Sequence, residues 1–267
     1  MKTVLTIAGS DCSGGAGIQA DLKTIAAHGL YGMSAVTALT AQNTTGVKGI
    51  LDVPPDFLRS QLDCIFTDIF PNAVKIGMLS AGALITVTAE VLREYQPKHV
   101  VLDPVMVSSS GRALLTPEAE RCLREELLSL VDLMTPNIPE AESLSGRSIE
   151  NERDMEDTAK CLSERYRTAV LVKGGHKAGG ADDVLYDGEC LHWYRGERLD
   201  NPNTHGTGCT LSSAIACRLA EGCTLDESVR LAKEYLTGAI RANLQLGSGS
   251  GPLNHNWREV ERIYEDK

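Results

Sequence analysis

Short apolar runs alternate with longer segments of helical periodicity along this chain, and this alternation restricts the possible fold more than any other feature. The apolar runs predict strands at residues 4–8, 34–40, 73–76, 99–102, 133–135 and 169–173. Helical patterns occupy residues 16–28 and 80–95, and two more open at Pro54-Pro55 and Thr116-Pro117. Strands connected by helices form parallel sheets, so we predict an α/β protein whose mostly parallel central sheet has helices on both faces, in three α/β/α layers.

The second half of the chain departs from strict alternation. Residues 183–186 and 190–194 predict an antiparallel pair, and helices are expected at 210–221 and 225–246. The Gly-Ser run at 247–251 is interpreted as a flexible loop before a terminal segment, because the remainder is too short to form a domain. We find no internal repeat and no clear linker, so a single domain over residues 1–267 is predicted.

The net charge of the 267-residue chain is −10, which argues against nucleic acid or an anionic membrane as the main partner. Clustered backbone amides can still bind a phosphorylated small molecule on an acidic protein. The eight cysteines include no C-x-x-C pair, and Met1-Lys2 leads into an apolar strand without a secretory pattern. No apolar run approaches the ~20 residues of a membrane span. We therefore expect a cytoplasmic protein with reduced thiols.

A glycine-rich loop at residues 9–17 follows the first predicted strand. Its spacing differs from G-x-G-x-x-G, and the chain contains no G-x-x-x-x-G-K-[ST], so neither a dinucleotide fingerprint nor a P-loop is indicated. A tight strand-to-helix turn is the competing interpretation of this loop. Asp21, in the following helix, is either a surface carboxylate stabilised by the helix dipole or a partner for a ligand hydroxyl or amine.

Ligands of open parallel sheets bind beyond the carboxyl ends of the strands, and unusual residues gather at those ends here. Gln42 ends one strand, and its amide offers a donor and an acceptor side by side, as the edge of an aminopyrimidine requires. A turn cap is the alternative role. Met78 ends another strand, where it either packs on a flat ring or fills the core.

Oxygen ligands and a lysine occur at three further strand ends. Asp103 ends one strand, while Asn137 and Glu140 lie three residues apart at the start of a helix. Such hard oxygen ligands suit Mg²⁺, often through water, although Asn137 and Glu140 also fit a capping box. Lys173 follows an apolar strand and is expected to neutralise nucleotide phosphates, with a surface lysine as the alternative.

The segment Asn203-Thr204-His205-Gly206-Thr207-Gly208-Cys209-Thr210 precedes a helix of small residues. Its two glycines allow backbone N–H groups to converge, and a helix N-terminus adds about half a positive charge, so the segment predicts an anion site, most often for phosphate. The same positive end is expected to lower the pKa of the Cys209 thiol from ~8.5. The alternative is an ordinary glycine-rich turn with Cys209 in the core.

These motifs, in this order, resemble those of the hydroxymethylpyrimidine and phosphomethylpyrimidine kinases. The matching segments are residues 9–11, 13–23, 40–44, 75–79, 103–106, 135–137, 173–176 and 204–210. The resemblance extends over residues 5–243 and implies a ribokinase-like fold, ATP as cosubstrate, Mg²⁺ and a role in thiamine biosynthesis. Such enzymes phosphorylate 4-amino-5-hydroxymethyl-2-methylpyrimidine and then its monophosphate.

The resemblance also implies site residues. The aminopyrimidine is held by Asp21 and Gln42, beside Gly9, Met78 and Val105. The catalytic anion hole consists of Gly206, Thr207, Gly208 and Cys209. The nucleotide is bound by Lys173, Asn137, Thr204 and His205, and Mg²⁺ is organised by Asp103 and Glu140 together with Asn137.

Cys209 stands where sugar kinases of this fold have an aspartate, and the pyrimidine kinases typically have a cysteine there. Either a Cys209 thiolate accepts the proton of the attacking hydroxyl, or positioning and charge neutralisation carry most of the rate. We predict that Cys209→Ala lowers kcat much more than it changes the affinity for the pyrimidine, and unchanged turnover would remove the base role.

Two other functions compete with this assignment: a pyridoxal kinase of vitamin B6 salvage, and a vitamin- or nucleotide-binding regulator without turnover. Gln42 favours the aminopyrimidine, and none of the groups needed for catalysis is missing. The resemblance further suggests a homodimer, with the early strands or the small antiparallel pair at the interface. Residues 107–112, rich in small side chains, are a candidate mobile lid.

Overall fold

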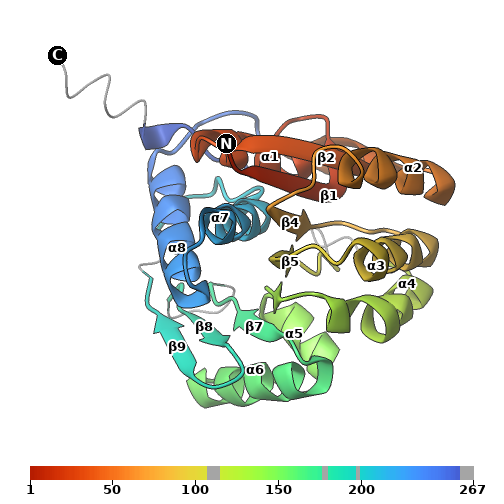
Figure 1. Cartoon of the computed structure of the whole chain (residues 1–267). Helices are drawn as coiled ribbons and strands as arrows, with labels where there is room; N and C mark the ends of the chain where they lie inside the picture. Colours follow the sequence, from red (N-terminus) through yellow and green to blue (C-terminus); the bar gives the residue numbers. More distant parts are fainter. Residues whose placement is uncertain (107–114, 176–179, 197–198, 259–267) are drawn as a thin grey trace.

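Figure 1 shows the computed structural model, which describes residues 1–106, 115–175, 180–196 and 199–258. A nine-stranded sheet runs through it in the order β3-β2-β1-β4-β5-β6-β7-β8-β9. The strands are β1 (Thr3–Asp11), β2 (Tyr31–Asn43), β3 (Gly46–Asp52), β4 (Ala73–Ile76), β5 (Val100–Leu102), β6 (Leu133–Met134), β7 (Ala169–Val172), β8 (Asp183–Tyr186) and β9 (Leu191–Tyr194). Six neighbouring strands are parallel: β2, β1, β4, β5, β6 and β7. Strands β3, β8 and β9 pair antiparallel at the two edges. The predicted mostly parallel sheet is confirmed.

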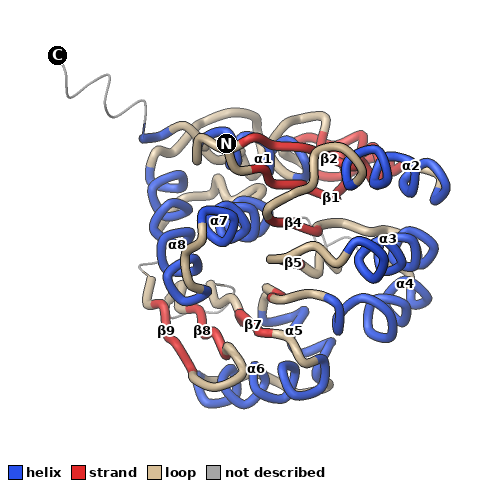
Figure 2. The backbone as a smooth tube through the Cα atoms, viewed as in Figure 1, coloured by secondary structure: helices blue, strands red, loops and turns tan. Residues whose placement is uncertain are grey.

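Helices cover both faces of the sheet (Figures 1 and 2). One face packs against α1 (Gly17–Ala27), α7 (Thr207–Glu221) and α8 (Leu225–Arg241). The other face packs against α2 (Pro55–Phe66), α3 (Gly82–Tyr95), α4 (Pro117–Cys122), α5 (Ile138–Ser145) and α6 (Glu152–Tyr166). Two short helical turns, Leu123–Leu127 and Leu128–Leu130, continue α4. These three layers are the predicted α/β/α arrangement.

The order of the strands places a crevice beside β1. The chain passes from β1 to β2 on one side and then to β4 on the other, so the connections that leave β1 and β4 diverge. Ligands of open parallel sheets bind at such switch points, outside the carboxyl ends of the strands. The glycine-rich loop after β1 and the segment after β4 therefore border the same space.

Several element boundaries differ from the predictions. Helix α7 begins at Thr207 rather than at residue 210, because the left-handed Gly206 (φ 85°) is its N-cap. Helix α8 ends at Arg241 rather than at residue 246. Strand β3 was not predicted, because it lacks the apolar run of a core strand and pairs with β2 at an exposed edge. The Gly-Ser run is held to the β2–β3 turn, since the Gly249 N–H donates to Thr44 Oγ1 (3.2 Å).

The eight cysteines are free thiols. Over the described ranges, no helix combines the length and the apolar character needed to cross a membrane.

Candidate active site

A cavity of about 980 Å³ opens at the carboxyl ends of the parallel strands. The structure brings almost all of the predicted site residues to its wall. They are Gly9, Gln42, Met78, Asp103, Val105, Asn137, Glu140, Lys173, Thr204, His205, Gly206, Thr207, Gly208 and Cys209. Asp21 is the exception. Residues from six strand ends and from the start of α7 thus share one space, as the strand-end argument required.

One end of the cavity has the shape and chemistry of a site for a flat ring. Gly9 lies so close to Met78 that a β-carbon on the glycine would stand 3.3 Å from the Met78 methyl group. Gln42 reaches the cavity from the end of β2, and Val105 and Val47 add apolar surface. An apolar slot with one amide at its edge can hold a heteroaromatic ring and read its polar edge.

The start of α7 has the glycines and the helix N-terminus on which the anion-site prediction depends. A β-carbon on Gly206 would lie 1.9 Å from the Gly15 carbonyl oxygen, and one on Gly208 would lie 2.9 Å from Asp103 Oδ2. Gly206 therefore requires glycine both for close approach and for its left-handed conformation (φ 85°), whereas at Gly208 glycine allows the close approach to Asp103. The first-turn amides of Gly208 and Cys209 have no carbonyl partner within the helix, and the helix dipole adds positive potential there. This arrangement suits a phosphate.

The expected lowering of the Cys209 pKa is wrong. Burial raises the pKa of this thiol to about 11; the charge of Lys75 lowers it, while Asp21 and Asp103 raise it. Desolvation and two carboxylates therefore outweigh the positive helix end. At neutral pH Cys209 is a thiol, which favours the alternative in which positioning carries most of the rate.

Lys173 and Asp103 form an ion pair beside the anion site. Lys173 Nζ donates to Asp103 Oδ1 (2.7 Å), and both side chains are largely buried. A β-carbon on Gly208 would lie 3.4 Å from Lys173 Nζ, so the lysine reaches the first turn of α7. The alternative interpretation of Lys173 as a solvated surface lysine is excluded by this burial. Burial lowers the pKa of Lys173, but the negative charges of Asp103 and Glu140 raise it by a larger amount. The side chain therefore remains an ammonium ion.

Asn137 and Glu140 form the capping box that was one of their two interpretations. The Glu140 N–H donates to Asn137 Oδ1 (2.9 Å), and the Asn137 N–H donates to Glu140 Oε2 (2.9 Å). Burial raises the pKa of Glu140 to about 7, with Lys173 opposing the rise and Asp103 adding to it. The cap does not exclude a ligand role, because both residues also line the cavity.

Asp103 and Glu140 fit a Mg²⁺ ion that completes its shell with water or phosphate oxygens. Both carboxylates are 4% exposed, and they line the same cavity. Mg²⁺ in nucleotide sites is commonly held by one or two carboxylates, with several waters retained. Within the described part of the chain, no group of three or more His, Cys, Asp or Glu side chains forms a complete metal cage. The residues present therefore suit a shared ion rather than a fully enclosed one.

The structure corrects the expectation for Asp21, which lies inside the protein instead of facing a ligand. Its carboxylate accepts hydrogen bonds from Thr6 Oγ1 (2.6 Å), Ser213 Oγ (2.7 Å) and Lys75 Nζ (2.8 and 2.9 Å). Asp21 and Lys75 are both 0% exposed. With its oxygens occupied from β1, β4 and α7, Asp21 ties three elements together beneath the cavity.

His205 and Thr204 line the cavity at the end where Gln42 lies. Nε2 of His205 lies 3.0 Å from Gln42 Nε2 and 2.9 Å from Asp11 Oδ2, which places this ring at the end of the cavity that Gln42 lines. The Thr204 N–H donates to Ser250 Oγ (3.3 Å), at the edge of the same loop. Both residues line the cavity, but neither contacts Lys173 in the described hydrogen-bond network.

The far end of the cavity includes residues that sequence reasoning missed. Lys233, Leu236, Thr237 and Ile240 of α8 line it together with Asn201. Lys233 Nζ donates to Asp183 Oδ2 (2.5 Å), a carboxylate that also accepts from the Gly174 N–H (2.9 Å). The periodicity of α8 indicates only an amphipathic helix, so no sequence signal pointed to these residues. The candidate lid at 107–112 lies outside the described residues.

A ring-binding end, a helix N-terminus for phosphate, and a buried lysine beside two carboxylates define a small-molecule phosphotransferase. The family model described as "Phosphomethylpyrimidine kinase" matches residues 11–254. The chain belongs to this family.

Two curated relatives illustrate the similarity. A hydroxymethylpyrimidine/phosphomethylpyrimidine kinase of Streptomyces coelicolor is 49% identical, with 95% of this chain and 94% of the relative covered. A thiamine biosynthesis bifunctional protein of Geobacter sulfurreducens is 51% identical over 95% of this chain. The match spans only 52%, about half, of that longer protein.

Solved structures confirm the ribokinase-like fold. A phosphomethylpyrimidine kinase from Clostridium difficile has a TM-score of 0.82 and 47% identity, covering 90% of this chain and 100% of its own. A pyridoxal kinase from Bacillus subtilis, solved as an ADP complex, has a TM-score of 0.90 and 40% identity, covering 97% and 99%.

Proposed function

We propose that this chain is an ATP-dependent kinase of thiamine biosynthesis, which phosphorylates 4-amino-5-hydroxymethyl-2-methylpyrimidine and then its monophosphate. The observation that carries the proposal is the placement of the Gln42 amide and the first turn of α7 in one cavity. The names of the relatives support it, since the Streptomyces coelicolor protein is a hydroxymethylpyrimidine/phosphomethylpyrimidine kinase.

The site accounts for phosphoryl transfer mainly by orientation and charge. Gln42 reads the amino group and ring nitrogen of the pyrimidine, and Met78 packs on the ring. The amides of Gly208 and Cys209, with Lys173 beside them, stabilise the negative charge on the transferring phosphoryl group. Positioned in this way, the substrate hydroxyl reacts with little need for a strong base.

Asp103 and Glu140 would hold the Mg²⁺ that accompanies the nucleotide. The ion would supply charge neutralisation at the phosphates. The rest of the cavity, toward α8, offers Leu236 and Ile240 as apolar surface for the nucleotide base. ATP as cosubstrate is supported by a Staphylococcus aureus pyridoxal kinase solved with AMP-PCP and pyridoxal, 32% identical to this chain with a TM-score of 0.88.

Incubation of the purified protein with ATP, Mg²⁺ and the hydroxymethylpyrimidine, in parallel with pyridoxal, tests the proposal. Mass spectrometry is expected to detect the pyrimidine monophosphate first and the diphosphate later. Pyridoxal phosphate with little pyrimidine product would instead assign the protein to vitamin B6 salvage. That second candidate is favoured by the Bacillus subtilis structure, whereas Gln42 favours the pyrimidine. Absence of both products would favour the regulator that binds without turnover.

Cys209→Ala is expected to lower kcat by only about tenfold and to leave the KM for the pyrimidine within about twofold. The reason is that a thiol with a pKa of about 11 is protonated at neutral pH, so it cannot supply the ~10²–10⁴-fold of a strong general base. Steady-state kinetics at pH 7.5, with ATP saturating, measures both values. A loss of ~10²-fold or more would restore the base role.

The free Mg²⁺ concentration needed for half-maximal kcat is expected to rise as the pH falls below 7. Glu140 has a pKa of about 7, so below that pH a proton competes with the metal, by up to ~tenfold per pH unit. Activity measured against free Mg²⁺ at pH 6, 7 and 8 gives the dependence. Glu140→Gln, which cannot ionise, is expected to require more Mg²⁺ at every pH and to lose the trend. A Mg²⁺ requirement of the unaltered protein that does not vary with pH would contradict this role.

We further propose a cytoplasmic homodimer that uses the β2–β3 edge. Leu39 and Leu51 face each other across these two strands and are 51% and 67% exposed, and Phe57 of α2 is also exposed. Covering such apolar side chains is favourable. Sedimentation equilibrium should give twice the chain mass, and Leu51→Lys should shift the protein to monomers. A wild-type monomer would contradict the proposal.

A further inference from the structure

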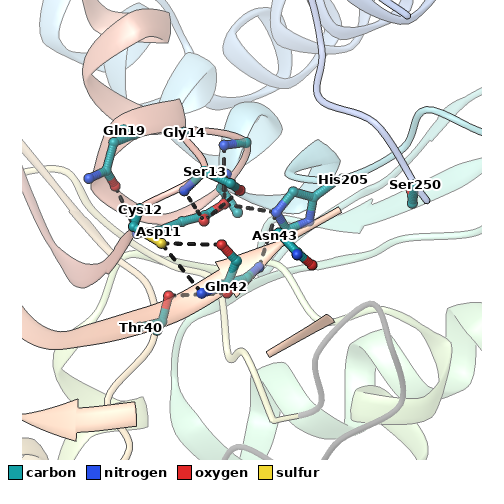
Figure 3. A network of polar contacts seen from close by, with 12 residues as sticks. Asp11, Cys12, Ser13, Gly14, Gln19, Thr40, Gln42, Asn43, His205 and Ser250 are labelled. Carbon is teal, nitrogen blue, oxygen red and sulfur yellow. Dashed lines mark hydrogen bonds and ion pairs between the residues drawn. The ribbon is translucent and has the colours of Figure 1, made fainter. Parts of the chain in front are cut away.

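Three polar side chains meet at the ring-binding end of the cavity: Asp11, His205 and Gln42 (Figure 3). His205 is 5% exposed and Asp11 is 2% exposed. The same nitrogen of the histidine, Nε2, lies 2.9 Å from Asp11 Oδ2 and 3.0 Å from Gln42 Nε2. Because this nitrogen faces a carboxylate oxygen and an amide nitrogen together, its protonation state decides both contacts.

Asp11 is held as a carboxylate by the glycine-rich loop. The N–H and hydroxyl of Ser13 donate to Oδ1 (2.9 and 2.8 Å), and the N–H groups of Gly15 and Ala16 donate to Oδ2 (3.1 and 2.9 Å). Burial raises the pKa of Asp11, but hydrogen bonds from His205, Ser13 and Ala16 outweigh this effect and lower the pKa to about 2. An ionised carboxylate only accepts, so Nε2 of His205 carries a hydrogen and donates it to Asp11.

A protonated Nε2 cannot bond to the amide nitrogen of Gln42, because both are donors. A second conflict lies on the other side of the amide. The Thr40 hydroxyl has one hydrogen but faces two acceptors, the Ser10 carbonyl (3.0 Å) and Gln42 Oε1 (3.3 Å). Half a turn of the terminal amide removes the donor–donor contact with His205 and gives the Thr40 hydroxyl a donor. Oε1 then shares the single Nε2 hydrogen of His205 with Asp11 in a bifurcated bond, and the amide nitrogen donates to Thr40. This torsion is roughly two-fold, so the rest of the side chain stays in place.

We propose that Asp11 and His205 are positioning residues that hold the Gln42 amide with its oxygen beside His205 and its nitrogen beside Thr40. The proposal rests on the proposed function, because it assigns the direction in which the pyrimidine binds. The glycine-rich loop thereby gains a role: its amides bind the carboxylate of Asp11 rather than a phosphate.

The chemistry of the substrate makes this direction matter. Its hydroxymethyl group, amino group and one ring nitrogen occupy successive positions around the ring. With the amino group on the Gln42 oxygen and the ring nitrogen on the Gln42 amide, the hydroxymethyl group points to the side of His205. Gly206, which directly follows His205 in the chain, is the N-cap of α7 and begins the proposed anion site. The opposite amide orientation would turn the reacting hydroxyl toward Thr40, away from that site.

Binding measurements on the full chain test whether Asp11 and His205 fix the Gln42 amide, and they do not rely on turnover. Calorimetry gives Kd for two probes, 4-amino-5-hydroxymethyl-2-methylpyrimidine and the same compound without its amino group. We expect the unaltered protein to prefer the amino compound by ~tenfold, because a ligand without the amino group leaves the ligand-facing lone pair of the Gln42 oxygen without a donor. His205→Leu is expected to reduce this preference to ~twofold, and His205→Gln, which keeps an N–H donor, to retain most of it.

Cys12→Ser is the matched control. Cys12 Sγ lies 3.2 Å from the Gln42 carbonyl oxygen and 3.4 Å from its backbone nitrogen, so it contacts the same residue but through the backbone. The preference of the Cys12→Ser variant for the amino compound should equal that of the unaltered protein. An undiminished preference in a folded His205→Leu variant, with a normal thermal unfolding midpoint, would overturn the proposal.

The imidazole ¹⁵N shifts of His205 in the ligand-free protein provide a second readout. Nε2 is expected to give the signal of a protonated nitrogen. An unprotonated Nε2 would overturn the proposed orientation of the Gln42 amide. Failure of the unaltered protein to bind either probe would contradict the proposed function instead, and the NMR result would still decide the state of the histidine.

Discussion

Lys173→Met is expected to lower kcat by about 10²–10³-fold, while the KM for the pyrimidine changes by less than about threefold. The lysine pairs with Asp103 at 2.7 Å and lies beside the first turn of α7, so its charge acts where the phosphoryl group passes. The contacts proposed for the pyrimidine lie at the Gln42 end of the cavity and should be retained in the variant. Initial-rate kinetics with the pyrimidine and ATP varied in turn gives kcat and the KM for each substrate.

Two controls accompany this variant. Lys98→Met removes an exposed lysine from the turn before β5, away from both the cavity and the β2–β3 edge, and should leave kcat unchanged. Lys173→Arg keeps the charge and should recover part of the rate, although guanidinium and ammonium differ in shape. Thermal unfolding of the methionine variant checks that Asp103, deprived of its partner, has not disrupted the fold. A raised pyrimidine KM with normal kcat would place Lys173 at the other end of the cavity.

Asp21→Ala is expected to lower the free energy of unfolding by about 3–5 kcal/mol, because it leaves a fully buried ammonium without its counter-charge. Lys75 Nζ lies 2.8 Å from Asp21 Oδ2, and both side chains are 0% exposed. Burial lowers the pKa of Lys75, but the negative charges of Asp21 and Asp103 and the hydrogen bond to Asp21 raise it overall. Urea unfolding followed by circular dichroism measures the loss.

The double variant Asp21→Leu, Lys75→Met separates a structural role from ligand binding. It removes both charges, so much of the lost stability should return, and the pyrimidine KM should remain near that of the unaltered protein. Arg59, which pairs with Asp63 on the surface of α2, offers a matched comparison: Asp63→Ala should cost ~1 kcal/mol or less. A stable Asp21→Ala protein with a strongly raised pyrimidine KM would restore the ligand role for Asp21.

Much of the fold was predictable because its signals are local. Buried strands such as β1 and β4 are short apolar runs, and α1 and α3 have helical periodicity, so neighbouring residues alone specify these elements. Strand β3 was missed because its residues are half exposed and its conformation depends on pairing with β2. Local pattern carries no information about that partner.

The candidate site divides in the same way. Gln42, Asp103 and Lys173 were found because parallel strands end at one edge of a sheet, so residues far apart in the chain must converge there. The Gly206–Gly208 segment was found because only glycine permits its conformation and close approach. These inferences need the order of elements and the residue types, and nothing about their surroundings.

The sequence by itself therefore determined the α/β class, the sheet edge at which the cavity lies and the glycine-rich helix start that faces it. Only the tertiary structure decided what each titratable group does there. Asp21 is a buried counter-charge to Lys75, Cys209 is a neutral thiol, and His205 faces Gln42. The physical reason is that periodicity and backbone conformation depend on adjacent residues. A pKa or a hydrogen-bond partner depends instead on burial and on charges from elements brought together by folding.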